Sequence, residues 1–60
     1  MTSLSKDRRR DILAVEAREI QLAIEVLNRF GFEHHIANHI LQVERDNRWA
    51  EIQRITDALS

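Results

Sequence analysis

The chain is 60 residues long, carries a formal net charge of −1 and has room for one small domain. Apolar residues make up 43% of it and charged residues 32%, a balance typical of folded rather than disordered proteins. The absence of cysteine excludes disulfides and thiolate metal sites, and a chain this short buries little surface by itself. Association with another chain is therefore the expected source of stability.

The first ten residues are basic, whereas the rest of the chain is acidic. Lys6, Arg8, Arg9 and Arg10 stand against Asp7, a net charge of +3, and the other fifty residues carry a net charge of −4. No apolar segment of a secretory signal follows, and no run approaches the roughly 18 apolar residues of a membrane span. These features predict a soluble, cytoplasmic protein. The basic cluster is a solvated terminus, a phosphate-binding site or a contact for an acidic protein surface.

A helix is expected over about residues 5–29, with Ser5 or Ser3 as its N-cap and residues 1–4 frayed. Its apolar residues follow the 4-3-4-3 spacing of a helical bundle: Leu13, Ala17, Ile20, Ile24 and Leu27. A second stripe contains Val15, Leu22 and Val26 and, more loosely, Ile12, Ala23 and Phe30. Together the stripes cover roughly 220° of the helix, about twice what one neighbouring helix needs. A second copy of the chain or a partner protein would cover the excess.

The only glycine lies in Phe30-Gly31-Phe32, and the chain has no proline. We expect Gly31 to end the first helix in a left-handed conformation, with a turn over 30–32 and both phenylalanines packed over the end of the bundle. A second helix is predicted over about 33–59. Its apolar positions are first Ile36, Ile40 and Val43, and then Trp49, Ile52, Ile55 and Leu59.

Five polar residues, 44–48, separate these two apolar sets. Either the helix continues through them with Glu44 and Arg48 paired at i,i+4, or it breaks near Asp46-Asn47 and one of these residues caps a third helix. The run contains no strong helix breaker, so continuity is favoured.

Few residues point to chemistry. His35 and His39 have the i,i+4 spacing of a metal pair, but no further ligand motif accompanies them or His34, and polar residues in a first helical turn are the simpler interpretation. Glu16 and Glu19 fall in or beside the apolar arc of the first helix. A carboxylate there could pair with Arg48 or His34 of the facing helix as a buried specificity element, or lie at a wet seam between subunits. A 60-residue hairpin offers no deep pocket, so no catalytic residue, metal or cofactor is expected and the protein is predicted not to be an enzyme.

The sequence thus predicts an all-α fold: one antiparallel helical-hairpin domain over residues 1–60, assembled as a homodimeric four-helix bundle. In layout alone this is similar to the small RNA-modulator bundles of plasmid copy control, and no functional residue follows from that similarity. The predicted function is that of a small regulatory or adaptor protein that binds an unidentified protein partner and itself. The residues predicted at the dimer or partner interface are Leu13, Ala17, Ile20, Ile24, Leu27, Ile36, Ile40, Val43, Trp49, Ile52 and Ile55. The alternative is an RNA- or DNA-binding regulator that uses Lys6, Arg8, Arg9 and Arg10, without membrane contact.

Overall fold

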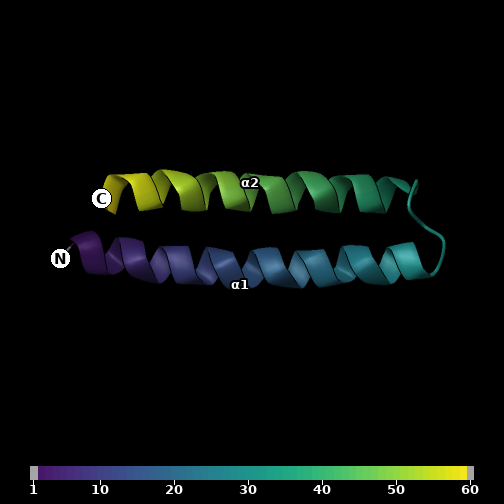
Figure 1. Ribbon diagram of the computed structural model, residues 1–60, viewed down its shortest axis with the longest axis horizontal. Helices are drawn as coiled ribbons and strands as arrows, with labels where there is room; N and C mark the ends of the chain where they lie inside the picture. The colour runs from purple at the N-terminus through teal and green to yellow at the C-terminus, as the bar shows by residue number, and fades with distance from the viewer. Residues whose placement is uncertain (1, 60) are drawn as a thin grey trace.

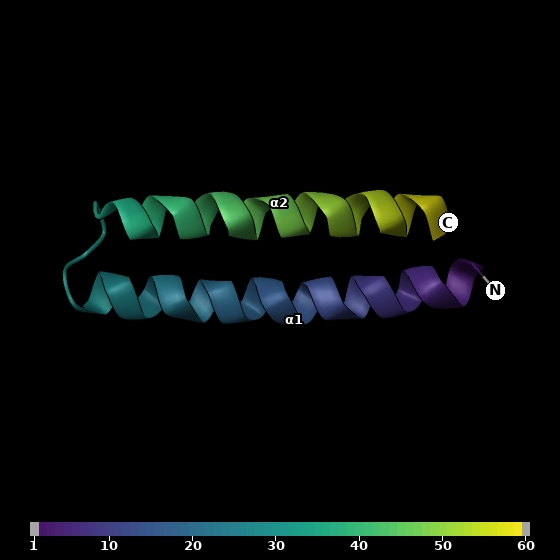
Figure 2. The same cartoon turned by 180° about the vertical axis from the view of Figure 1, so that it is seen from behind.

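Two helices and the turn between them make up the fold (Figure 1). The computed structural model describes the backbone of residues 2–59 and the side chains of residues 5–59. Helices α1 (Thr2–Arg29) and α2 (Ile36–Leu59) run in opposite directions along a rod of 45 × 14 × 13 Å. The turn closes one end of the rod, and both chain ends lie at the other, which we call the open end (Figures 1 and 2). The predicted all-α helical hairpin is confirmed.

Helix α1 begins three residues earlier than expected. Thr2 is already helical, so Ser3 and Ser5 lie inside the helix instead of capping it. Residues 2–10 contain neither glycine nor proline, and nothing in them stops the helix from extending toward the N-terminus. Of the expected frayed segment 1–4, residues 2–4 are therefore helical, and Met1 lies outside the described residues.

Gly31 ends α1 as expected. Its φ of +84° is left-handed, a conformation that costs an L-residue with a side chain roughly 1–2 kcal/mol. The Gly31 N–H donates to the Asn28 carbonyl at 3.1 Å, and the Phe32 N–H donates to the Leu27 carbonyl at 2.8 Å. These two bonds form a Schellman motif, which satisfies the last carbonyls of the helix and reverses the chain. Phe30 stays 70% exposed, so the expectation that it packs over the end of the bundle is wrong.

The turn extends to His35, so α2 begins three residues later than expected. The His35 Nδ1 accepts a hydrogen bond of 3.0 Å from the Ala37 N–H, and the His35 carbonyl accepts from the His39 N–H at 3.2 Å. His35 therefore caps α2, using an imidazole nitrogen where a serine or aspartate oxygen is more usual. The ring of Phe32 packs edge-on against that imidazole, with the two ring centroids 5.8 Å apart, and so holds the imidazole over the helix end.

The two helices meet along one seam, which we call the inner seam. On α1, Leu13, Ala17 and Ile24 are buried and Ile20 and Leu27 are half-buried, as the 4-3-4-3 spacing predicts for one packed face. On α2 the inward residues are also spaced by three and four in alternation, and all of them are buried or half-buried. They are Asn38, Leu41, Arg45, Arg48, Ile52, Ile55 and Leu59. Helix α2 is continuous through the polar run 44–48, so continuity is confirmed and the alternative break near Asp46-Asn47 is absent.

A buried amide fastens the turn to both helices. Asn38 is fully buried, and its side-chain nitrogen donates to Asn28 Oδ1 at 2.7 Å and to the Phe32 carbonyl at 3.1 Å. Its side-chain oxygen accepts from Gln42 Nε2 at 2.8 Å. Because a buried amide without partners is costly, this set of bonds favours one arrangement of the turn over the others.

Candidate interaction surfaces

The face of α1 that points away from the inner seam is apolar. Its side chains are 45–61% exposed and form what we call the outer stripe: Ile12, Val15, Leu22 and Val26. With Glu19 between Val15 and Leu22, the five positions are spaced by three and four residues in alternation, as in the seam of a coiled coil. The described part of the chain supplies nothing that covers this stripe. The second stripe expected on this helix is therefore real and exposed.

Helix α2 also carries apolar side chains on its outside. Ile36, Ile40 and Val43 are 64%, 53% and 45% exposed and lie away from the inner seam, which at this level is made by Asn38 and Leu41. Trp49 is 45% exposed and borders a shallow hollow formed with Ala17, Arg18, Gln21 and Leu22 of α1. Its ring thus lies at the boundary between the two helices and solvent.

The predicted interface residues fall into two groups. Leu13, Ala17, Ile24 and Ile55 are buried inside the hairpin, and Ile20, Leu27 and Ile52 are half-buried beside them. Ile36, Ile40, Val43 and Trp49 remain on the surface. The side chains of the second group and of the outer stripe of α1 are 45–64% exposed, so they are available to another molecule.

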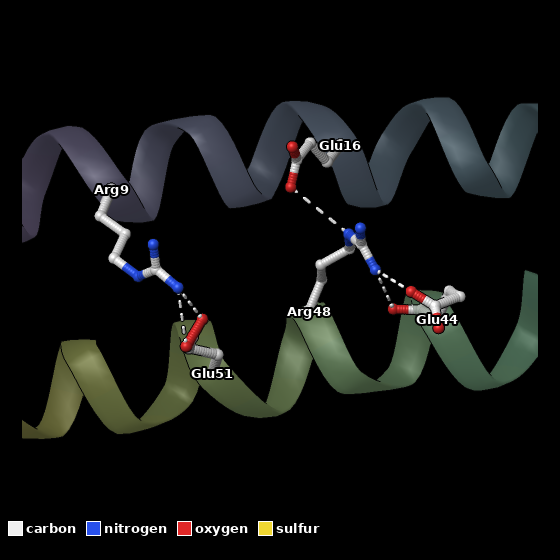
Figure 3. Close-up of polar contacts among 5 residues, drawn as sticks. All are labelled: Arg9, Glu16, Glu44, Arg48 and Glu51. Atoms are coloured by element: carbon white, nitrogen blue, oxygen red, sulfur yellow. Dashed lines mark hydrogen bonds and ion pairs between the residues drawn. The ribbon is translucent and has the colours of Figure 1, made fainter.

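A groove lies at the open end, on one side of the inner seam. Its volume is about 600 Å³, and its charged lining consists of Arg8, Arg9, Arg48, Arg54, Glu16 and Glu51. Arg9 Nη2 binds both oxygens of Glu51, at 3.1 and 2.8 Å, across the two helices (Figure 3). Arg8 and Arg54 make no ion pair within the described residues, so they are the cations that remain available at the groove.

The predicted basic cluster is therefore only partly free. Arg10 Nη2 pairs with Asp7 Oδ1 at 3.1 Å, one turn away on α1, and Arg9 is engaged by Glu51. Lys6 and Arg8 are exposed and unpaired among residues 5–59. The structure brings Arg54 of α2 to the same groove as Arg8, a proximity that the linear sequence does not indicate.

Arg48 joins the helices at mid-length. Its Nη1 pairs with Glu44 one turn earlier on α2, and its Nε lies 3.4 Å from Glu16 Oε1 on α1 (Figure 3). Nearby, Arg45 Nη1 donates to Gln21 Oε1 at 2.8 Å. Both carboxylates that the sequence offered as partners of Arg48 therefore contact it. The hydrogen bond to Glu44, with a smaller contribution from Glu16, raises the pKa of the Arg48 guanidinium above its ordinary value. We call Arg45, Arg48 and their partners Glu16, Gln21 and Glu44 the polar waist.

The three histidines lie close together beside the turn. His34, His35 and His39 border a shallow hollow beside the turn, but the His35 Nδ1 is used for the helix cap. Within residues 2–59, no group of three or more histidine, aspartate and glutamate side chains is arranged to hold a metal ion. The region is therefore described best as a capped helix start with two solvent-facing imidazoles.

Sequence reasoning missed the roles of Asn38 and Arg45 on the inward face of α2, and it predicted the ion pairs of Arg48 without placing Arg48 on that face. The 3-4 spacing of positions 38, 41, 45, 48, 52, 55 and 59 was the available signal. It was obscured because three of these seven positions are polar, so apolar periodicity alone pointed to Ile36, Ile40 and Val43.

Comparison of the chain with protein-family models, with curated proteins and with solved structures finds no match. Neither of the described helices has a stretch that is both long and apolar enough to cross a membrane. The surfaces described above therefore carry the functional argument.

Proposed function

We propose that this protein is a small non-enzymatic regulator or adaptor that works by helix–helix packing and assembles as a homodimeric four-helix bundle. One observation carries the proposal, namely the exposed outer stripe of α1. A stripe with heptad spacing is the surface that a second helix recognises, because its side chains interlock with those of a partner with the same spacing.

The distribution of apolar side chains supports association. Four hydrophobic residues are buried in the described chain, whereas ten large hydrophobic residues are at least 45% exposed. The total accessible surface of 4667 Å² exceeds by roughly 600 Å² what a compact monomer of this mass exposes. An isolated pair of helices with so small a core is marginally stable, and covering the outer stripe would add apolar burial without changing the hairpin.

Trp49 is the best candidate for the centre of a contact with a different protein. Exposed tryptophans beside a hollow are common among the residues that dominate interface energies. The carboxylates nearest the groove, Glu16 and Glu51, are held by arginines, which suits ion pairing better than acid–base chemistry.

The test of association is equilibrium sedimentation combined with thermal melting over a hundredfold range of protein concentration. A dimer predicts that the melting temperature rises with concentration. A monomer that melts cooperatively at one temperature throughout this range would refute the homodimer.

Partner binding needs its own test. Trp49→Ala should abolish capture of the protein partner from lysate, whereas Phe30→Ala, a matched loss of an exposed aromatic, should not. Loss of the dimer in Trp49→Ala would instead assign Trp49 to the self-association surface, because Trp49 shares its hollow with Arg18 and Leu22. Equal capture by both variants would exclude Trp49 from the contact.

An RNA- or DNA-binding regulator is the second candidate, because Arg8 and Arg54, which make no ion pair with any described residue, line one groove from different helices. Binding would occur through phosphates and would weaken steeply with salt. Arg8→Ala/Arg54→Ala should reduce the affinity for any sequence, as measured by fluorescence anisotropy with labelled RNA and DNA at low salt. No binding by the wild type under these conditions would eliminate this function.

A further inference from the structure

The charges beside the outer stripe are regularly placed. If Ile12, Glu19 and Val26 occupy the a positions of a heptad and Val15 and Leu22 the d positions, the g positions on one flank are Asp11, Arg18 and Glu25. Their signs alternate. Among the side chains that the structure describes, residues 5–59, Asp11 and Arg18 make no ion pair, and Glu25 accepts only a hydrogen bond from Gln21 at 3.2 Å. These charges are therefore free to select a partner.

The alternation selects an antiparallel partner if that partner is a second copy of α1. In a parallel pair each g residue faces the e residue five positions later on the other helix. Asp11 would then lie beside Glu16 of the second copy, and the two carboxylates would repel each other. Turning one helix end for end brings the same flank of both helices together, so g faces g. Arg18 then meets Glu25 of the second copy, and the symmetry of the pair repeats this contact.

Of the two antiparallel alignments that set four of the five stripe positions against one another, only one avoids like charges. With the two-fold axis between residues 20 and 21, Val15 faces Val26 of the second copy and both Arg18–Glu25 contacts form. A shift of the axis to residue 17 places Arg18 against Arg18. A shift to residue 24 places Glu25 against Glu25, and like charges facing each other are unfavourable.

The central position of Glu19 has a consequence in this alignment. Glu19 faces Leu22 of the second copy, so each subunit contributes one carboxylate to an otherwise apolar contact. A polar residue at one a position reduces the stability of a coiled coil but fixes its alignment. The outer stripe brings to this contact four apolar side chains that are each 45–61% exposed in the hairpin.

We infer that the outer stripe of α1 is the self-association surface and that it binds α1 of a second copy in antiparallel orientation, with Arg18 of each subunit against Glu25 of the other. This inference rests on the proposed homodimer and assigns the face and the alignment through which it forms. Because the outer stripe points away from the inner seam, only the α1 helices of the two subunits touch, and the four helices form a layer in the order α2–α1–α1–α2 in place of a four-helix bundle.

Cross-linking tests the orientation directly, because the chain has no cysteine. An oxidised mixture of the Val15→Cys and Val26→Cys chains should form the mixed disulfide in preference to either homodimer. In the inferred alignment the two Val15 positions are about 16 Å apart along the axis, too far for a disulfide. Preferential cross-linking of each variant with itself would overturn the antiparallel arrangement.

Charge exchange tests the alignment. Arg18→Glu and Glu25→Arg should each weaken the dimer roughly tenfold at low salt, because two attractive contacts become repulsive. The double variant should return to within about threefold of the wild type. Arg54→Glu, a charge reversal on α2, is the matched control and should leave the dissociation constant unchanged. Glu19→Leu should tighten the dimer about tenfold, because it removes two carboxylates from the contact.

These outcomes separate the inference from the proposed function. A wild type that stays monomeric at every concentration refutes both. A wild-type dimer that is insensitive to the single charge reversals, or is not rescued by the double variant, refutes the α1–α1 contact and leaves the homodimer in place.

Discussion

The side-chain nitrogen of Asn38 lies 2.7 Å from the side-chain oxygen of Asn28, so a fully buried amide at the start of α2 is bonded to the last turn of α1. The same nitrogen also reaches the Phe32 carbonyl. One side chain therefore connects both helices and the turn. Such a contact stabilises a unique closure of the hairpin rather than a general association of apolar faces.

Replacing Asn38 should destabilise the hairpin. Asn38→Ala removes the hydrogen bonds of this fully buried amide to Asn28 and to the Phe32 carbonyl, each worth about 0.5–1.5 kcal/mol. Urea unfolding at fixed protein concentration measures the loss. Asn47→Ala, at an exposed position of the same helix, is the control and should change stability by less than about 0.5 kcal/mol. Equal effects of the two substitutions would contradict the role given to the buried amide.

Gly31 should tolerate asparagine better than alanine. A Cβ at this position would meet no atom within 4 Å, so the cost of substitution comes from the backbone conformation alone. Gly31→Ala is expected to lose about 1 kcal/mol, and Gly31→Asn less, since asparagine adopts the left-handed region more readily. Thermal melting monitored by circular dichroism measures both. A stability of Gly31→Ala equal to that of the wild type would show that the turn can close in another conformation.

The cap at His35 can be tested by exchange of one capping group for another. His35→Ala removes the acceptor of the Ala37 N–H and should cost about 1 kcal/mol, whereas His35→Asn should retain most of the stability. Hydrogen exchange at the Ala37 amide provides a local measurement. His34→Ala is the neighbouring control, and faster exchange in this control than in His35→Ala would be inconsistent with the cap.

The two faces of the hairpin should respond differently to a charge. Ile24 is 3% exposed in the inner seam, so Ile24→Asp buries an unpaired carboxylate and should unfold the chain. Ile36 is 64% exposed, so Ile36→Asp should preserve the helical content. Far-ultraviolet circular dichroism distinguishes the outcomes. A folded Ile24→Asp chain would mean that the inner seam contributes little to stability.

Local signals were sufficient to predict both helices and the turn. The lone glycine at the middle of the chain marked the reversal, and the strict spacing from Leu13 to Leu27 identified the inward face of α1. The absence of a helix breaker between Val43 and Trp49 correctly favoured a continuous α2, and the i,i+4 rule identified the contact between Glu44 and Arg48.

The inward face of α2 was harder to predict because hydrophobicity does not select it. Asn38 and Arg48 point inward while Ile36 and Ile40 point outward, since the turn and its hydrogen bonds fix the rotation of α2. The length of the turn depends on the His35 cap, which uses a residue type with a weak capping preference. The contacts of Asn38 with α1 and with the turn join residues far apart in the chain, so they leave little trace in local periodicity.

The polar waist also disfavours other alignments of α2 along α1. If α2 slid by seven residues toward the turn, Arg48 would leave Glu16 and come to the level of Ile24. The opposite slip would bring Arg45 to Leu13. Either error places a guanidinium against apolar side chains, so a misaligned hairpin is penalised at mid-length, where a purely aliphatic contact would let the helices slide.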